Sequence, residues 1–292
     1  MQSLDKIKRR IRSVQTTSKI TGAMKLVATA KMKKLMTQFK TVNTFCQDFY
    51  TIIEDLVKTI PISGSEKKNI NKPKLWILVS SSLGLCGAFN INVCKFLMTM
   101  MQHEDKVLVV GRKGYSYLKS HGHEAAVIGH LDFSNTELDY LSMLPACENV
   151  IEQFNGGAFS SVHLVYTKFV NSLTFNPTEI QLLPFDSSLF KNTDQKQSLL
   201  NLSADKKEID YDPSKEDILK SSLPIFFATS LFAAISESRV CENGARRNAM
   251  ETATDNAREL IDDLTLEFND ARQQNITQEI NEIVAGADGS AT

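Results

Sequence analysis

The sequence predicts an α/β protein in which two long terminal helices form an antiparallel coiled coil beside a domain of alternating strands and helices. Three observations lead to this fold class. Small and apolar residues recur at coiled-coil spacing near both ends of the chain, and the two ends carry opposite charges. Between them, short apolar runs alternate with segments that suit helices, as in a βαβ sheet.

The N-terminal helix is predicted from a repeat without proline. Its mean spacing of about 3.5 residues fits a coiled coil better than a straight surface helix, and its length is on the order of 80 Å. Pro61 and the polar segment 63–73 end the helix. The repeat consists of Leu4, Ile7, Ile11, Val14, Thr17, Thr21, Met24, Ala28, Met32, Leu35, Phe39, Val42, Cys46, Phe49, Ile53 and Leu56.

The C-terminal helix is predicted over about 214–285. Its only proline, Pro224, lies near the start, and Gly286 and Gly289 end it. Its repeat consists of Ala249, Ala253, Ala257, Leu260, Leu264, Phe268 and Ala271.

Charge favours pairing of the two helices, although the net charge of the whole chain is only −1. Residues 1–40 hold eleven basic residues and one acid, whereas residues 242–288 hold eleven acids and four arginines. A basic helix beside an acidic helix is favourable. The pair is antiparallel if the middle of the chain folds at one end of it.

The middle, residues 73–215, predicts a parallel sheet. Apolar runs rich in Val, Ile and Leu occupy 74–81, 106–111, 123–129 and 161–169, and the segments 89–101 and 136–154 suit helices. Residues 174–185 are typical of an edge or returning strand, and 191–215 of an exposed loop. The predicted domains are residues 1–60, 73–215 and 216–292.

Composition excludes several kinds of site and segment. The five cysteines form no C-x-x-C pair and have no histidine at ligand spacing, so we expect reduced, buried thiols and no metal site. The longest apolar run, 223–235, is too short to span a membrane. The basic N-terminus is similar in composition to a mitochondrial presequence. Its repeat continues far beyond any cleavage point, which favours mature structure.

No catalytic site is predicted. The segment 80–90 follows the first strand and opens a helix, but it lacks both nucleotide-binding glycine patterns and a nearby lysine, which favours a tight turn. Arg112 and Lys113 follow the second strand and are typical of a solvated helix start. We find no serine, cysteine or carboxylate constellation around His103, His121, His123, His130 and His163, and we expect no cofactor.

The charged helices remain as the functional surface. Eleven cations in forty residues suit phosphate, but residues 1–38 contain no aromatic side chain for base stacking, which disfavours nucleic acid. Thr and Ala dilute the apolar face, which disfavours a membrane-surface helix. A protein partner is therefore predicted.

Three segments resemble one family. Residues 4–32 contain I-x-S-V-x-x-T-x-K-I-T-x-A-M-x-x-V-A-x-x-K-M, residues 84–90 read G-L-C-G-x-x-N, and residues 253–287 form a C-terminal signature. The whole chain resembles the gamma subunit, the central shaft of the rotary F-type ATP synthase. The resemblance implies a coiled coil and a Rossmann-like domain that binds no nucleotide. It implies a non-catalytic shaft that turns inside an alpha3-beta3 ring and couples ATP synthesis or hydrolysis on beta to rotation and proton transport.

The resemblance also implies two sets of contact residues and a location. One set meets the beta subunits or forms shaft contacts: Met24, Lys25, Glu242, Arg246, Arg272, Gln273 and Thr277. The other set lies in the foot and meets an epsilon-type subunit and the membrane rotor ring: Tyr211, Asp212 and Pro213. As alternatives, Met24 belongs to the coil core and Arg246 pairs with Glu242 on one helix face. The expected location is peripheral, on the cytoplasmic face of a bacterial membrane, with the matrix side of the mitochondrial inner membrane as the alternative.

Ser82, Leu83 and Arg247 depart from the family pattern, which has Asp-Arg at the first two positions and Met at the third. They leave open a specialised F1-like ATPase that drives another machine without a proton channel. The regulatory cysteine pair of chloroplast-type members is not evident.

Overall fold

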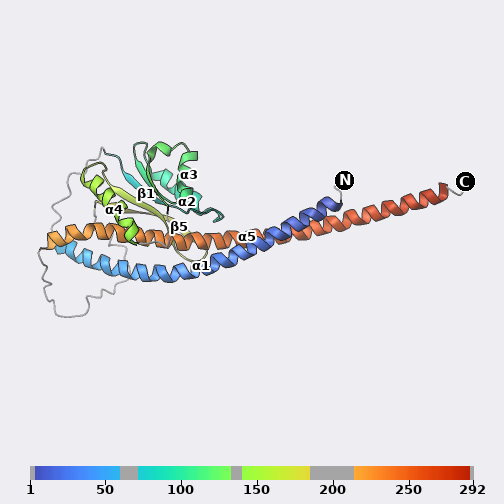
Figure 1. The fold of residues 1–292 in the computed structure, drawn as a ribbon, viewed down its shortest axis with the longest axis horizontal. Coiled ribbons are helices and arrows are strands. Elements are labelled where there is room, and N and C mark those ends of the chain that lie inside the picture. Colours follow the sequence, from blue (N-terminus) through green and yellow to red (C-terminus); the bar gives the residue numbers. More distant parts are fainter. Residues whose placement is uncertain (1–3, 60–71, 133–139, 185–213, 290–292) are drawn as a thin grey trace. The chain divides into compact units, whose positions relative to one another are not determined.

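The computed structural model describes residues 4–59, 72–132, 140–184 and 214–289 (Figure 1). Two long helices, α1 (Leu4–Thr59) and α5 (Lys215–Gly289), enclose the α/β segment in the sequence. The chain divides into two compact units, one of residues 1–29 with 246–292 and one of residues 30–245. Because these units cut across both helices, the division into residues 1–60, 73–215 and 216–292 stays a prediction.

A five-stranded sheet forms the centre of the second unit. Its strands are β1 (Leu75–Val79), β2 (Lys106–Val110), β3 (Val127–Leu131), β4 (Val162–Phe169) and β5 (Phe175–Leu183). They lie in the order β3-β2-β1-β4-β5. The first four are parallel and β5 is antiparallel to β4, which confirms the predicted returning strand.

The third strand begins later than predicted. Residues 123–129 were expected to be extended, but Glu124–Ala126 form a short 3₁₀ helix, η1, closed by the bond from the Ala126 N–H to the His123 carbonyl. Pairing with β2 starts only at Val127, opposite Val107. The strand therefore begins where its neighbour offers backbone partners.

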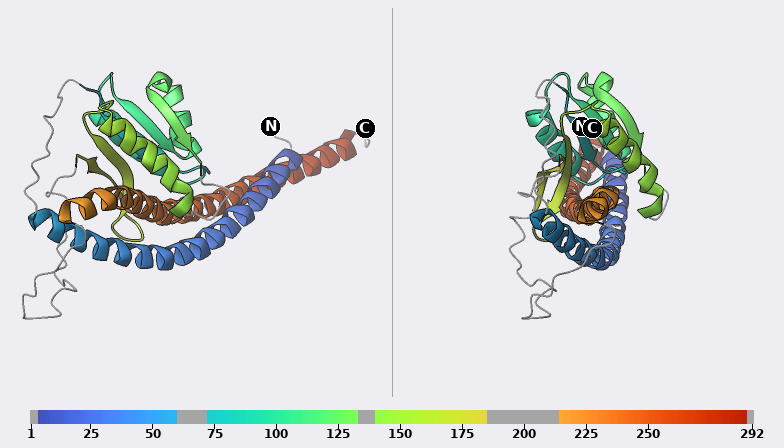
Figure 2. Two further views of the ribbon diagram at one scale, coloured as in Figure 1. Left: turned by 60° about the vertical axis from the view of Figure 1, so that its left-hand side comes forward. Right: turned by 90° about the vertical axis from the view of Figure 1, so that its left-hand side faces the viewer.

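Helices cover both faces of the sheet (Figures 1 and 2). Along β1, Leu75, Ile77 and Val79 face the side of α4 (Tyr140–Asn155) and α5, and their cluster includes Met143 of α4 and Leu231 of α5. Trp76 and Leu78 face the side of α2 (Phe89–Met100) and α3 (Arg112–Ser120). Burial of the strand on both faces explains its unbroken apolar sequence.

In the second unit, α1 packs against α5. The Cys46 thiol points to the Thr229 carbonyl at 3.8 Å, and the Tyr50 hydroxyl donates to Ser230 Oγ at 2.9 Å. The Tyr50 ring also lies 5.1 Å from the ring of Phe226. Tyr50 lies four residues after Cys46, and its ring partner Phe226 lies three residues before Thr229, which is the direction expected of an antiparallel pair; Ser230 lies one turn from Phe226 on the same face of α5.

The first unit has the same antiparallel pairing. A hydrogen bond of 2.7 Å joins the hydroxyls of Thr21 and Thr254, and Lys25 Nζ lies 2.8 Å from Glu251 Oε1. Here four residues forward on α1 accompany three residues back on α5, which confirms the antiparallel pairing.

The predicted repeats are nearly in phase with the buried stripes. On α5, Met250 and Thr254 are buried, while the predicted neighbours Ala249 and Ala253 are half-buried. Leu260 is exposed and Ile261 is half-buried instead. The predicted phase was wrong by one residue there, because small and apolar residues occur at both of two adjacent helical positions.

One helix segment, Ser221–Val284, is long and apolar enough to cross a membrane by length and composition alone. The apolar window within it is 67% buried inside the structure. Phe227, Ala228 and Leu231 belong to the core of the sheet, so this apolar surface is already used in packing.

Candidate functional site

The carboxyl ends of β1 and β4 are where an open α/β sheet binds its ligand, because the strand order reverses there. In this protein the position is filled by side chains. Cys86 and Phe89 pack against Cys241 of α5, with Phe169 and Phe175 around them. The arrangement leaves an apolar cluster where a nucleotide would otherwise lie.

The loop after β1 is held by its own polar groups. The Ser81 hydroxyl donates to the Leu83 carbonyl at 2.6 Å, and Asn90 Oδ1 accepts from the Ser81 N–H at 2.9 Å. Asn90 Nδ2 also lies 3.1 Å from Cys86 Sγ. The backbone of Leu85 adopts a φ of 61°, which is unusual for a residue with a large side chain. The segment is therefore the tight strand-to-helix turn that the sequence favours.

Arg112 and Lys113, the cation pair after β2, are both exposed, as expected of a solvated helix start. Arg112 Nε lies 3.1 Å from Asp132 Oδ2, and Ser82 Oγ donates to the other carboxylate oxygen. Gly111 has a φ of 95°, and a Cβ there would lie 2.3 Å from the Ser80 carbonyl oxygen. The helix start is thus fixed against the first loop.

The prediction that no serine or carboxylate gathers around the histidines is wrong for His163. Its Nε2 lies 2.7 Å from Ser161 Oγ and its Nδ1 lies 2.6 Å from Glu179 Oε1. Glu179 comes from the next strand, 16 residues away, so sequence spacing gave no signal. Ser161 is 8% exposed, which leaves its hydroxyl out of reach of a substrate. The three side chains connect β4 to β5.

All five cysteines are buried and unpaired with one another, which confirms the predicted thiols. Burial raises the pKa of Cys46, Cys94 and Cys147 to about 12. At neutral pH these thiols carry no thiolate and react slowly.

Met24 and Lys25 lie on α1 in the first unit. Met24 is half-buried, and Lys25 pairs across the helices with Glu251. The hydrogen bond from Lys25 lowers the pKa of Glu251, and the charge of Arg247 acts in the same direction. Arg247 also donates to Asn248 Oδ1 at 2.8 Å, so this departure from the family pattern adds a cation beside the Lys25 pair.

Glu242 and Arg246 are half-buried positions on α5. Each of the two residues has at least one hydrogen bond, ion pair or other electrostatic interaction. Their pairing with each other, and their contact with a partner subunit, stay predictions.

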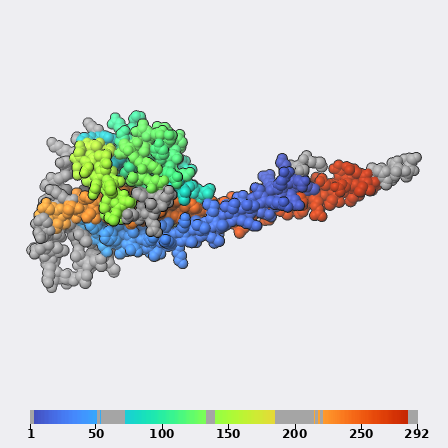
Figure 3. All heavy atoms as spheres, viewed as in Figure 1, coloured from blue at the N-terminus to red at the C-terminus, as the bar shows by residue number. Residues whose placement is uncertain are grey.

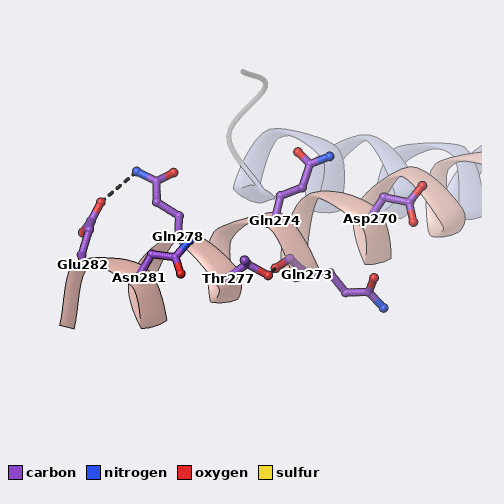
Figure 4. Close-up of a pocket in the computed structure, with 7 residues that line it drawn as sticks. All are labelled: Asp270, Gln273, Gln274, Thr277, Gln278, Asn281 and Glu282. Atoms are coloured by element: carbon purple, nitrogen blue, oxygen red, sulfur yellow. Dashed lines mark hydrogen bonds between the residues drawn. The ribbon is translucent and has the colours of Figure 1, made fainter. Parts of the chain in front are cut away.

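Arg272, Gln273 and Thr277 are exposed near the end of α5. The last described turns of α5 extend past the first described turn of α1 (Figure 3). There the helix surface carries an open depression lined by uncharged and acidic polar side chains (Figure 4). The residues that line it are Asp270, Gln273, Gln274, Thr277, Gln278, Asn281 and Glu282.

Two predictions remain, one on the foot residues and one on metal binding. Tyr211, Asp212 and Pro213 lie outside the described residues. Among the residues that are described, no group of three His, Cys, Asp or Glu side chains gathers in a way that would hold a metal ion.

Comparison with known proteins decides the family. The family model described as ATP synthase matches residues 3–289. The chain is 40% identical to the ATP synthase gamma chain of Malacoplasma penetrans over 294 residues, which cover 99% of this chain and 100% of the relative. The chain belongs to the ATP synthase gamma chain family. It is also 37% identical to the ATP synthase gamma chain of Ureaplasma urealyticum over 287 residues, 98% of this chain and 99% of that one.

Solved structures agree on the fold. A chain of the Euglena gracilis mitochondrial ATP synthase, in an OSCP/F1/c-ring structure, has a TM-score of 0.69 at 17% identity, covering 98% of this chain and 94% of that chain. A central stalk/c-ring structure from Tetrahymena thermophila mitochondrial ATP synthase gives 0.57 at 22% identity, covering 80% and 99%. The resemblance seen in the three sequence segments is confirmed. Gamma chains are the non-catalytic central-stalk subunits of the F-type ATP synthase rotor.

Proposed function

We propose that this chain turns inside a ring of three alpha and three beta subunits, where it couples ATP synthesis or hydrolysis on beta to rotation and proton transport. Membership of the gamma chain family supports this role. A paired helix resists torsion better than a single one, and the chain's paired helices suit a shaft.

One observation carries the proposal, namely the apolar surface at the end of α5. Ile276, Ile280 and Ile283 are 43%, 54% and 71% exposed. Their spacing of four and three residues places them on one helix face. Exposed apolar side chains gathered in this way are typical of a protein interface. An enclosing ring of subunits would cover them.

The proposed contacts with the ring lie on both helices. Near the end of α5, Arg272, Gln273 and Thr277 supply exposed polar groups beside the apolar face. Met24 and Lys25 on α1, with Glu242 and Arg246 on α5, complete the set. Lysines of α1 would attract acidic partner loops through screened, long-range forces that guide without locking.

The proposed foot contacts are Tyr211, Asp212 and Pro213, which meet an epsilon-type subunit and the membrane rotor ring. The proposed location is peripheral, on the cytoplasmic face of a bacterial membrane. The bacterial origin of the two relatives described above supports it, and the matrix side of the mitochondrial inner membrane is the alternative.

Co-purification tests the role. Tagged full-length chain, produced in its own cells and extracted in mild detergent, should bring down alpha- and beta-type subunits in threefold excess over itself. Retrieval of the chain without them would contradict the proposal. Duplex DNA that stays bound at physiological salt would favour the basic nucleic-acid binder instead.

Site-directed cross-linking tests the contact residues. Because the native cysteines are buried, a cysteine introduced at Gln273 or Thr277 is the preferred labelling site. A photoreactive label there should capture beta subunits in the assembled complex, whereas the same label at exposed Ser120 on α3 should not. Equal capture from all three positions would contradict the assignment.

A specialised F1-like ATPase is the second candidate. Leu83, at a position where the family has Arg, is 55% exposed on the loop after β1. An exposed leucine suits an apolar neighbour, whereas the arginine of the family pattern suits an acidic or polar one. Co-purification with alpha and beta subunits but without subunits of the membrane rotor ring would favour this candidate.

A further inference from the structure

The strand β4 is longer than its neighbour β1. Pairing with β1 covers Val162–Val165, opposite Leu75–Leu78. Beyond Val165, β4 continues to Phe169 and keeps β5 on its other side. The backbone groups of Thr167 and Phe169 on the β1 side therefore need other partners, since buried N–H and C=O groups are almost always hydrogen-bonded.

Side chains of α5 supply these partners. The Thr167 N–H donates to Ser238 Oγ at 3.2 Å, and the Phe169 N–H donates to Glu237 Oε1 at 2.9 Å. The Cys241 thiol donates to the Thr167 carbonyl at 3.4 Å. Three side chains from one turn of helix thus take the place of the missing strand.

A close approach accompanies these bonds. At Gly244, one turn further along α5, a Cβ atom would lie 2.5 Å from Cζ of Phe175 in β5. The aromatic ring therefore occupies the space that a side chain would fill. The Phe175 ring beside Gly244 limits sliding of α5 along the sheet.

The remaining contacts between α5 and the sheet are less directional. Phe227, Ala228, Leu231, Ala234 and Ile235 pack into the core through apolar surface. Apolar burial depends on area rather than on angle, whereas hydrogen bonds weaken steeply when they bend. The three polar contacts therefore define the rotation of α5 about its own axis.

We propose that Glu237, Ser238 and Cys241 form a joint that fixes the rotation of α5 against β4, so that torsion in α5 passes into the α/β layer. Among the described residues, the core cluster on one face of the sheet includes residues of α5, and neither this cluster nor the one on the other face includes a residue of α1. α5 is the path by which the layer is driven. This inference rests on the proposed rotor function, and it names the positioning residues through which that function is transmitted.

The test uses the full chain assembled with alpha and beta subunits, with the ring fixed to a surface. A bead is attached to a cysteine introduced at Ser120 of α3, which is exposed. The variance of the bead angle during pauses then measures how stiffly the layer follows the shaft.

The double variant Glu237→Ala/Ser238→Ala removes two of the three polar contacts. We expect the angular variance to rise about twofold, since hydrogen bonds supply the angular restraint, while the rate of ATP hydrolysis stays unchanged. Glu237→Gln keeps an oxygen acceptor for the Phe169 N–H and should leave the variance at the native value.

Unchanged variance in the assembled double variant would overturn the joint, even if less complex forms, because a purely structural role alters yield and not stiffness. If the double variant fails to assemble, Ser238→Ala alone takes its place. Unchanged angular variance in that variant would likewise overturn the joint. Failure of the unaltered chain to assemble with alpha and beta subunits would instead contradict the proposed function.

Discussion

At the residue scale, the carboxyl group of Glu237 is buried and also accepts a hydrogen bond from the backbone of β4. It is only 9% exposed, and burial raises its pKa. The Phe169 N–H and the charge of Lys168 oppose this shift without cancelling it. The side chain accepts a backbone hydrogen bond in either protonation state, but the ionised form is the costly one.

We therefore predict that Glu237 makes stability depend on pH. Its pKa in the folded protein is raised above the unfolded value, so its stabilising contribution is complete at low pH and is lost as pH rises through the folded pKa. Glu237→Gln, which cannot ionise, should raise the melting temperature more at pH 8 than at pH 5. Thermal unfolding of both proteins at the two pH values checks this, and an equal shift at both would contradict it.

A second residue-scale prediction concerns Met24. A lysine there would add a cation next to Lys25 and its partner Glu251, at a half-buried position of the coil. We expect Met24→Lys to impair coupling more than assembly, with the rate of ATP hydrolysis changing less than ATP-driven proton transport. Met24→Leu preserves size and is the control. Native coupling in the lysine variant would refute the expected contact with the ring.

At the scale of the element, α5 has different neighbours on different faces. In the second unit one face packs with Tyr50 of α1, and another enters the core of the sheet through Leu231. At Gly244 the ring of Phe175 in β5 occupies the space that a Cβ atom would take. Glycine inside a helix normally costs stability, so its presence here is explained by the ring of Phe175.

We predict that Gly244→Ala destabilises the protein, against the usual trend for helices. Alanine gains about 1 kcal/mol in helix propensity, but overpacking against Phe175 costs about 1–3 kcal/mol. The control is Gly22→Ala on α1, where a Cβ meets nothing within 4 Å and a gain is expected. Urea unfolding of both variants measures the two signs, and stabilisation by both would show that the ring moves aside freely.

The elements were predictable from the sequence to the extent that periodicity determines them. The repeat from Leu4 predicts α1, and apolar runs such as 106–111 predict buried strands. The predicted phase of α5 was wrong by one residue at Ala249, because Ala249 and Met250 both suit a core position. Two sets of buried polar side chains were missed, namely His163 with Glu179 and Glu237 with Ser238. In both cases the partners come together only through strand register or helix docking, and their residue types are ordinary at the surface.

At the scale of the whole molecule, the two units differ in what holds them together: opposite charges in the first and a buried apolar core in the second. In the first unit, residues 4–29 of α1 carry seven basic residues and one acid, and residues 246–289 of α5 carry ten acids and four arginines. Glu251 and Lys25 form one direct pair, and the others attract at longer range. The second unit has a large buried core instead.

We predict that salt weakens the first unit selectively. Between about 0.1 M and about 1 M NaCl the screening length falls from about 10 Å to about 3 Å, so attraction between the two helices should fade. Hydrogen exchange of amides in residues 4–29 and 255–270 should accelerate severalfold, while amides of β1 and β2 stay unchanged. The same acceleration in both groups would mean that charge does not distinguish the units.

The first unit joins residues that leave the ribosome far apart in time. Its basic half, residues 4–29, is made before the sheet, and its acidic half, residues 246–289, is made after it. The interval covers about 200 residues, or roughly 10–40 s at ordinary rates of synthesis. During that time the acidic half of α5 has not been made, whereas the strands β1 to β5 are made within the interval, before residue 246. Translation thus sets the order in which the protein assembles, with the first residues made among the last to be paired.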